Sequence, residues 1–151
     1  MKKYELTNQR TVLSNNIILH RIKALKDFGD VKEGDLGGWI EKEENLSQEG
    51  DCWVYDYAKV YGNVKVYDDA VVCGNADVYG NAEIYGNADV YDNACVYGNA
   101  KAYRDAIICG NAEVFGNACV YDYAKVYGNV RVYGDAEIFD NVKVSEGEIY
   151  Y

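Results

Sequence analysis

The chain has 151 residues, a net charge of -10 and an isoelectric point near 4.5. This length is that of one domain, and the acidic balance argues against a protein that binds nucleic acid or an anionic membrane surface through positive charge. The single histidine excludes a three-histidine zinc site within one chain and makes a Ser-His-Asp triad hard to build.

The first residues, Met1–Asn8, begin with two lysines but lead into no apolar stretch, so they do not predict a secretory signal. No apolar run approaches the roughly 18 residues of a membrane span. The cysteines are odd in number and follow no C-x-x-C spacing, which indicates reduced thiols rather than disulfides or zinc ligands; they are Cys52, Cys73, Cys95, Cys109 and Cys119. We therefore expect a cytoplasmic protein with no metal and no cofactor.

The N-terminal third predicts a β-hairpin followed by a turn-rich stretch. Two apolar segments, Thr11–Leu13 and Ile17–Ile22, flank the polar residues Ser14–Asn16, which is typical of a hairpin. The turn-rich stretch that follows contains Gly34, Gly37, Gly38 and Trp39. This part of the chain differs clearly from the rest.

From Val54 onward the chain consists of hexapeptides without a single insertion. Each hexapeptide begins with Val or Ile, except at Ala102, and four residues later carries Ala or Val. Between these two positions lie, in most repeats, an aromatic residue and a Gly-Asn or Asp-Asn pair, as in Val78-Tyr79-Gly80-Asn81-Ala82-Glu83.

This period predicts a three-sided solenoid in which each hexapeptide supplies one short strand and one corner. The small residue and the next aliphatic residue, such as Ala76 and Val78, are two positions apart, so both face inward. Gly and Asn tolerate a left-handed backbone best and form the corner. Three hexapeptides make a coil of 18 residues, so residues 54–143 give about five coils and a rod of roughly 24 Å.

Residues one coil apart should then stack in columns along the outside. Two faces carry aromatic columns, Tyr61, Tyr79, Tyr97, Phe115 and Tyr133 on one and Tyr67, Tyr85, Tyr103, Tyr121 and Phe139 on the other. The third face alternates Tyr55, Cys73, Tyr91, Cys109 and Tyr127. Asparagine columns should follow two corners, at 63, 81, 99 and 117 and at 75, 93, 111 and 129. Opposite charges at the sixth position, such as Lys59 with Asp77, favour the same register.

A solenoid leaves the backbone groups and the core of its terminal coil exposed. We therefore interpret residues 1–52 as a cap on the N-terminal end and residues 53–151 as the hexapeptide-repeat β-helix. At the other end, Val144, Ile149, Tyr150 and Tyr151 are expected to cover the last coil less completely.

The rigid six-residue period resembles the left-handed parallel β-helix of hexapeptide-repeat proteins. The cap and its junction resemble the YdcK-like branch of these proteins, through Lys26–Val31, Gly37–Ile40 and Asn45–Asp56. The resemblance implies an all-β fold, a left-handed parallel β-helix with a small N-terminal β-hairpin cap. Proteins of this kind are often labelled acyltransferases because of their fold, and similar short ones are common in phages and mobile elements. The resemblance identifies no catalytic residue in this chain.

Acyl transfer from acetyl-CoA is the enzymatic hypothesis that the resemblance implies. Such enzymes typically use a histidine base near a subunit boundary and a loop that interrupts the repeat, and the solenoid of this chain has neither. His20 lies between Leu19 and Arg21 in the hairpin, where a strand residue is the simpler interpretation. The related γ-type carbonic anhydrases need three histidines, which one chain does not supply. We favour a protein that is not an enzyme, because fold alone does not confer function.

Three other hypotheses are disfavoured by the residues. Ice binding would require threonine columns, but Thr7 and Thr11 lie outside the solenoid. Calcium binding would need converging oxygens, whereas Arg104 and a Gly-Asn pair interrupt the acidic corner formed by Asp68, Asp69, Asp105, Asp122 and Asp140. An acidic rod that imitates DNA and inhibits a host protein stays an alternative, although mixed charges dilute any phosphate-like spacing and the charge also serves solubility.

The outward aromatic columns indicate a contact surface, because contiguous apolar patches mark interfaces and tyrosine combines an apolar body with a polar tip.

The segments 54–67 and 120–133 are near-copies. The number of hexapeptides between them is not a multiple of three, so they fall on different faces, which favours a function of overall shape over a small catalytic site. We expect a structural or protein-binding homo-oligomer, a trimer by the family resemblance, with the ten aromatic residues of the first two columns as its interface. A host or other partner protein stays possible, with no direct nucleic acid or membrane contact.

Overall fold

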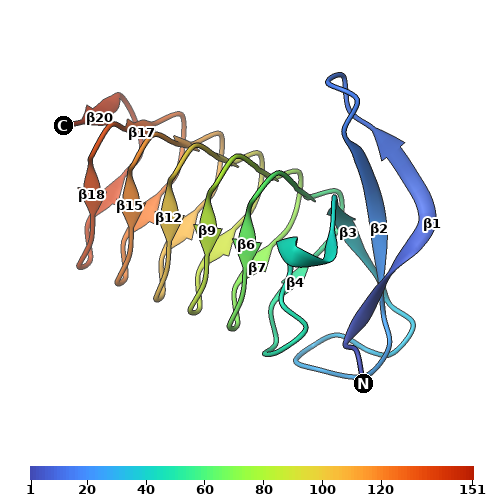
Figure 1. Ribbon diagram of the computed structural model, residues 1–151. Helices are drawn as coiled ribbons and strands as arrows, with labels where there is room; N and C mark the ends of the chain where they lie inside the picture. Colours follow the sequence, from blue (N-terminus) through green and yellow to red (C-terminus); the bar gives the residue numbers. More distant parts are fainter.

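The structure is a computed structural model that describes residues 1–151. The chain forms a three-sided β-solenoid of stacked parallel strands, with a β-hairpin laid across its N-terminal end (Figure 1). The coils wind left-handedly from the hairpin toward the C-terminus. These features confirm the predicted fold. The one helical element, η1 (Glu43–Asn45), is a single 3-10 turn, and no helix has the length and apolarity to cross a membrane.

The hairpin consists of β1 (Tyr4–Val12) and β2 (Ile18–Ala24), which pair antiparallel as predicted. Strand β1 starts well before the predicted apolar segment, because its pairing continues past a register shift between Leu6 and Arg10. The polar residues at this shift carry no strand pattern in the sequence. Strand β3 (Leu36–Ile40) then pairs antiparallel with β2 on one side and parallel with the solenoid on the other.

Each hexapeptide forms one short strand, and successive strands occupy the three faces in turn. The first face continues β3 with β5 (Lys59–Val60), β8 (Asp77–Val78), β11 (Cys95–Val96), β14 (Glu113–Val114), β17 (Arg131–Tyr133) and β20 (Glu148–Tyr150). The second contains β6 (Lys65–Val66), β9 (Glu83–Ile84), β12 (Lys101–Ala102), β15 (Cys119–Val120) and β18 (Glu137–Ile138). The third contains β4 (Trp53–Val54), β7 (Val71–Val72), β10 (Asp89–Val90), β13 (Ile107–Ile108), β16 (Lys125–Val126) and β19 (Lys143–Val144).

Neighbouring strands pair parallel with the equivalent strand of the next coil, in the predicted register. On the first face Cys95 lies between Asp77 and Glu113, and the same offset holds on the other two faces. The backbone amide of Tyr79 donates to the carbonyl of Val96 at 3.0 Å, and equivalent bonds join every pair of coils. The register of the whole rod is therefore set by one repeated backbone interaction.

The solenoid has about six turns, one more than the regular hexapeptides predict. The additional turn is made by β3, Leu46 and β4, and the offset to its partners is longer than a regular coil: Trp39 pairs with Lys59, and Leu46 with Val66. Buried Asn45 completes this irregular turn, since its side-chain amide donates to the carbonyls of Gly62 and Val64 at 3.1 and 3.0 Å. Because this turn lacks the six-residue pattern, periodicity alone does not reveal it.

A single apolar core runs along the axis and is built from the inward Ala, Val and Ile residues. At the N-terminal end the core is closed by Tyr4, Ile22 and Trp53, each at most 1% exposed. At the other end β20 pairs with β17 and lengthens the first face only, so Val142 remains 48% exposed. The expected incomplete cover at this end is confirmed.

The left-handed corner residue is the first member of each Gly-Asn or Asp-Asn pair, not both members. On the corner that follows the first face, Gly98 has φ +67, and a Cβ there would lie 2.9 Å from the backbone nitrogen of Gly116 in the next coil. Glycine meets both demands without strain. The other corners also accept non-glycine residues with φ of 57 to 58, among them Asp92 and Arg104.

Replacing Gly98 with Ala should lower the free energy of unfolding by roughly 2 kcal/mol or more, because it adds backbone strain and a contact with the next coil. The matched control is Gly147→Ala, since Gly147 has φ +81 but nothing within 4 Å of the added Cβ. The control should lose about 1 kcal/mol of unfolding free energy, because alanine there adds left-handed backbone strain but no contact with another coil. Chemical denaturation measures both, and equal losses would show that close coil approach contributes nothing.

Candidate functional site

The first ladder consists of the predicted aromatic residues of the first face, and the structure brings them together as a continuous stack. Tyr79 and Tyr97 have ring centroids 4.8 Å apart and planes within 1° of parallel. The other neighbours in this column stack in the same way. Tyr150 adds a sixth ring, 5.0 Å from Tyr133, which the sequence did not predict because the offset between these two tyrosines is shorter than a regular coil.

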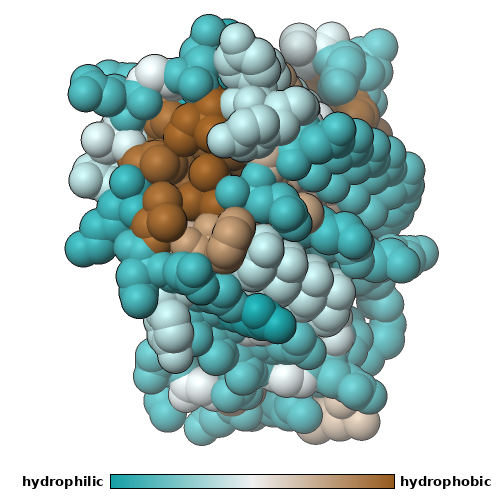
Figure 2. Space-filling model, turned by 90° about the vertical axis from the view of Figure 1, so that its left-hand side faces the viewer, coloured by the Kyte–Doolittle hydropathy of each residue, from teal (hydrophilic) through white to brown (hydrophobic).

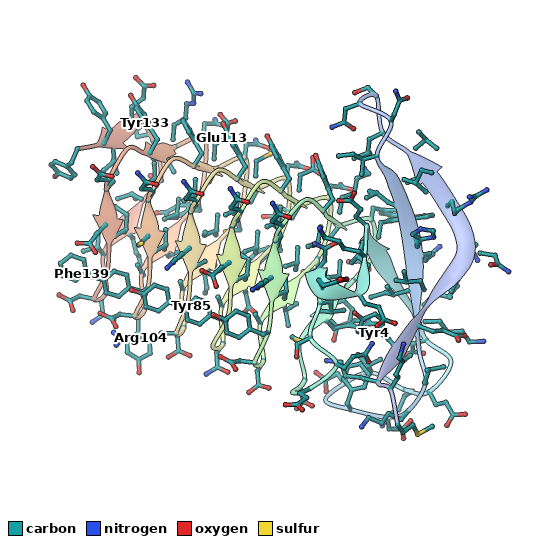
Figure 3. The ribbon with its side chains drawn as sticks, in the orientation of Figure 1. Tyr4, Tyr85, Arg104, Glu113, Tyr133 and Phe139 are labelled. Carbon is teal, nitrogen blue, oxygen red and sulfur yellow. The ribbon has the colours of Figure 1, made fainter.

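The second ladder runs along the second face from Tyr67 through Tyr85, Tyr103 and Tyr121 to Phe139. Its centroid spacings are 4.8 to 5.4 Å, and all planes lie within 11° of parallel. Figure 3 shows this ladder along one edge of the rod, where Tyr85 and Phe139 are labelled, and Tyr133 of the first ladder on the opposite edge. The two ladders therefore give the rod two aromatic edges along its length.

Stacking decides which part of each ring is presented to a partner. The ring faces are turned toward the coils above and below, so the ring edges and the hydroxyls point outward. Within each ladder, both faces of an inner ring are therefore already occupied by its neighbours, and a planar base cannot stack there. The arrangement suits a partner that packs alongside the rod.

The ladder tyrosines lie in an environment that disfavours their charged form. Burial by the stacked neighbours raises the pKa of Tyr79 to about 12, and the adjoining Tyr97 adds to this shift. Burial likewise raises the pKa of Tyr67 to about 12, helped by the carboxylate of Glu83. The hydroxyls therefore remain neutral hydrogen-bonding groups well above the ordinary tyrosine pKa.

Ion pairs between coils lie beside both ladders. Arg131 is 3.0 Å from the Glu113 carboxylate and lies over the ring of Phe115 at 5.3 Å, next to the first ladder. Lys101 is 3.6 Å from Glu83 beside the second ladder. These pairs confirm part of the predicted charge alternation, and they neutralise charge next to the aromatic rings.

One asparagine column is confirmed as a continuous hydrogen-bonded ladder. The side-chain amide of Asn63 donates to Asn81 at 3.0 Å, and the chain of bonds continues through Asn99 and Asn117 to Asp135. On the other predicted corner, one such bond is present, between Asn111 and Asn129. There the Asp56 and Asp92 carboxylates instead accept backbone amides of the next coil.

The acidic corner considered for calcium is held by internal contacts. Arg104 pairs with Asp122 at 2.5 Å, which holds the pKa of the Asp122 carboxyl below its ordinary value. Asp68 accepts the backbone amide of Gly86 at 3.1 Å. No three His, Cys, Asp or Glu side chains lie close enough together to hold a metal ion.

Lys3 is a buried amine that the sequence did not indicate. It is 1% exposed, and its Nζ donates to the carbonyls of Gly50 and Cys52 at 3.1 and 2.8 Å and lies 3.4 Å from the Cys52 Sγ. Burial lowers the pKa of Lys3 and raises that of Cys52. Through these contacts Lys3 holds the N-terminus against the first turn, and its side chain borders a hollow of about 630 Å³ that Lys26, Asp27 and Phe28 also line.

His20 lies at a hollow of about 430 Å³ in the cap, lined also by Leu6, Thr7, Asn8 and Arg10. The hollow lies where β1 shifts its register against β2, and His20 pairs directly with Arg10 across these strands. The only histidine is half-buried rather than enclosed. The sequence places His20 in a strand, as the structure does, but it gives no sign of the hollow.

No protein-family model matches the chain. A 63-residue segment is 43% identical to a protein of Escherichia coli (strain K12) named uncharacterized acetyltransferase YdcK. The match covers 37% of this chain and 19% of that protein's length. Together with the three-sided solenoid, it confirms the similarity to hexapeptide-repeat β-helix proteins of the YdcK-like branch.

The raised pKa values predict a specific loss of stability in alkali. Because folding keeps these tyrosines protonated, their contribution is fully present below the ordinary pKa near 10 and is lost as pH rises through about 12. Tyrosinate absorbance and circular dichroism should therefore change together in this window. Tyr79→Phe, which removes one such hydroxyl, should shift the transition to higher pH, and an unchanged transition would contradict this account.

Proposed function

We propose that the chain is a non-enzymatic, structural or protein-binding β-solenoid that associates with copies of itself through the first and second ladders. The observation that carries this proposal is the pair of unbroken aromatic stacks along two edges of one rigid rod. All the parallel-stacked aromatic pairs of the molecule belong to these two ladders.

The ladders meet two requirements of a good contact surface. Their rings are held in place by stacking before any partner binds, so little side-chain freedom is lost on association. Their outward edges are half-buried aromatic surface carrying hydroxyls, which combines apolar contact with hydrogen bonding. The spacing of both ladders is that of the coils, so the edges of two rods match along their length.

Two ladders per chain also fit a closed ring of subunits. A cyclic assembly uses two different surface patches on each subunit, one for each neighbour. If the first ladder of one copy packs beside the second ladder of the next, three copies close a trimer with parallel axes. The net charge of -10 opposes such packing, but the ion pairs of Arg131 and Lys101 reduce the charge next to the ladders.

The triple variant Tyr79→Ser, Tyr97→Ser and Phe115→Ser should reduce the mass in solution to a smaller species, because it removes the centre of the first ladder. Sedimentation velocity on untagged protein measures this. The control is Tyr57→Ser with Tyr123→Ser, which removes tyrosines that are 68% and 65% exposed and lie outside the ladders. A triple variant that remains folded by circular dichroism and keeps the parental mass would overturn the proposal.

Acyl transfer is the second candidate function, because the E. coli relative is named an acetyltransferase. In this chain the residue that favours it is His20, which adjoins a hollow with Arg10 as a cationic neighbour. A histidine can act as a general base, and an arginine can hold a phosphate of an acyl-CoA. We assign the role of general base to His20 and the role of phosphate ligand to Arg10, and we assign these roles to no other residue.

If this candidate holds, the purified protein should release free thiol from acetyl-CoA with an amine acceptor, and His20→Gln should reduce the rate by about 100-fold. Arg10→Gln should instead weaken acetyl-CoA binding, measured by calorimetry. Thiol release that is unaffected by His20→Gln, or no heat of binding with the parent protein, would exclude the site.

A further inference from the structure

The two ends of the rod bury their apolar residues to different degrees. Figure 2 looks along the rod at the end formed by the last strands, where apolar residues gather in one patch surrounded by polar residues. At the hairpin end, by contrast, Tyr4, Ile22 and Trp53 are at most 1% exposed. The core at the hairpin end therefore stays covered only while the N-terminal segment remains attached to the first turn.

Lys3 is a point at which this segment is attached. Its Nζ donates to the carbonyls of Cys52 and Gly50 at 2.8 and 3.1 Å and lies 4.8 Å from the centre of the Phe28 ring. Lys3 takes part in none of the ion pairs of the molecule. A buried ammonium without a carboxylate partner is costly, so the site favours the neutral amine. Burial accordingly lowers the pKa of Lys3, although Cys52 and Asp51 oppose this shift.

The thiol of Cys52 lies directly beside this amine. The Nζ of Lys3 and the Sγ of Cys52 are 3.4 Å apart, and Cys52 is fully buried. A neutral amine is a nucleophile, and a cysteine sulfur oxidised to a sulfenic acid is attacked by nitrogen nucleophiles to give a sulfenamide. Reacting atoms held roughly 3 to 3.5 Å apart are already in an approach geometry. The pair is therefore positioned for a bond between nitrogen and sulfur.

A small oxidant can approach the pair from the surface. The hollow of about 630 Å³ at this end is lined by Lys3, Glu49 and Gly50, among others. The Sγ of Cys52 contacts the Lys3 amine and lies 3.7 Å from the carbonyl of Glu49. Residues that contact the sulfur thus also line the hollow. A molecule as small as hydrogen peroxide needs only a local opening of this layer to reach the thiol.

We propose that Lys3 and Cys52 form an oxidation-sensitive pair, in which hydrogen peroxide generates a covalent bond between Nζ and Sγ. This modification site lies in the cap, away from both aromatic ladders. The inference is therefore independent of the association proposed above and goes beyond it.

The reaction has two balanced steps. First, Sγ attacks one oxygen of hydrogen peroxide, the O–O bond breaks, and the leaving hydroxide takes the thiol proton to form water. Sulfur thereby loses two electrons to the peroxide and becomes a sulfenic acid. Second, the Nζ lone pair attacks Sγ, the S–O bond breaks, and the leaving hydroxide takes one amine proton to form a second water. One amine, one thiol and one hydrogen peroxide thus give one sulfenamide and two waters.

This bond fastens the cap to the solenoid covalently. It joins residue 3 to residue 52, and the segment between them contains β1, β2, β3 and η1. A cross-link that closes a long loop lowers the entropy of the unfolded chain. The oxidised protein should therefore keep its cap, and the covered core beneath it, under conditions that detach the cap of the reduced protein.

The first experiment treats the purified protein with hydrogen peroxide and analyses its tryptic peptides by mass spectrometry. The expected product joins peptide 3–10 to peptide 43–59 with the loss of two hydrogen atoms, and dithiothreitol should separate the two peptides again. Cys95 is the internal control, because its coil neighbours Asp77 and Glu113 offer no amine, so it should oxidise without a link to lysine. A Cys52 that stays a free thiol while Cys95 oxidises, or that gains oxygen without a link to Lys3, would overturn the proposal.

The second experiment uses variants of the pair. In Lys3→Arg the guanidinium keeps the positive charge but is a poor nucleophile, so Cys52 should gain oxygen without forming the cross-linked peptide. Because this buried substitution can disturb the cap, Cys52→Ser is a second variant that removes the sulfur at nearly constant size. Chemical denaturation before and after peroxide should show a higher midpoint for the oxidised parent protein and no shift for Cys52→Ser. An equal shift in both proteins, or no shift in fully cross-linked parent protein, would contradict the fastening role.

Discussion

The coil-to-coil backbone register is the constraint on which the rest of the structure depends. Each strand donates and accepts hydrogen bonds with the equivalent strands of the neighbouring coils, so every position lies directly above the equivalent position of the next coil. The ring of Tyr97 lies on that of Tyr79, and Asn99 bonds to Asn81, because the backbone has already aligned them. A single inserted residue in one coil would displace the core, the ladders and the corner in that coil together.

This constraint also decides what kind of surface the protein offers. Within the regular coils, side chains of one kind are arranged in lines, and all three hollows of the molecule involve the cap, one of them where the cap meets Asn63–Lys65 of the first regular coil. The hollow beside His20 occurs in the cap, where β1 loses its regular pairing. Lateral binding thus follows from the repeat, whereas any catalytic site would have to arise where the repeat is broken.

The ends of the rod present a different physical problem from its sides. A stack of coils satisfies its internal backbone groups by repetition, but its two terminal coils have no neighbour. The chain solves this at one end with non-repeating elements, including the buried Lys3 and the aromatic contact between Phe28 and Trp53 at 5.2 Å. Near the C-terminus the six-residue spacing is lost after Val144, and Gly147 turns the chain into one additional strand, β20, which pairs with β17.

The sequence by itself determined the period, the three faces, both aromatic ladders, one asparagine ladder and the hairpin. These follow from local alternation and from a strict six-residue repeat, which together fix where every side chain points. Only the tertiary structure decided the irregular turn through Leu46, the long register-shifted β1, the burial of Lys3, the hollow at His20 and the addition of Tyr150 to the first ladder. Each of these depends on contacts between distant segments that share no period, so no local pattern in the sequence encodes them.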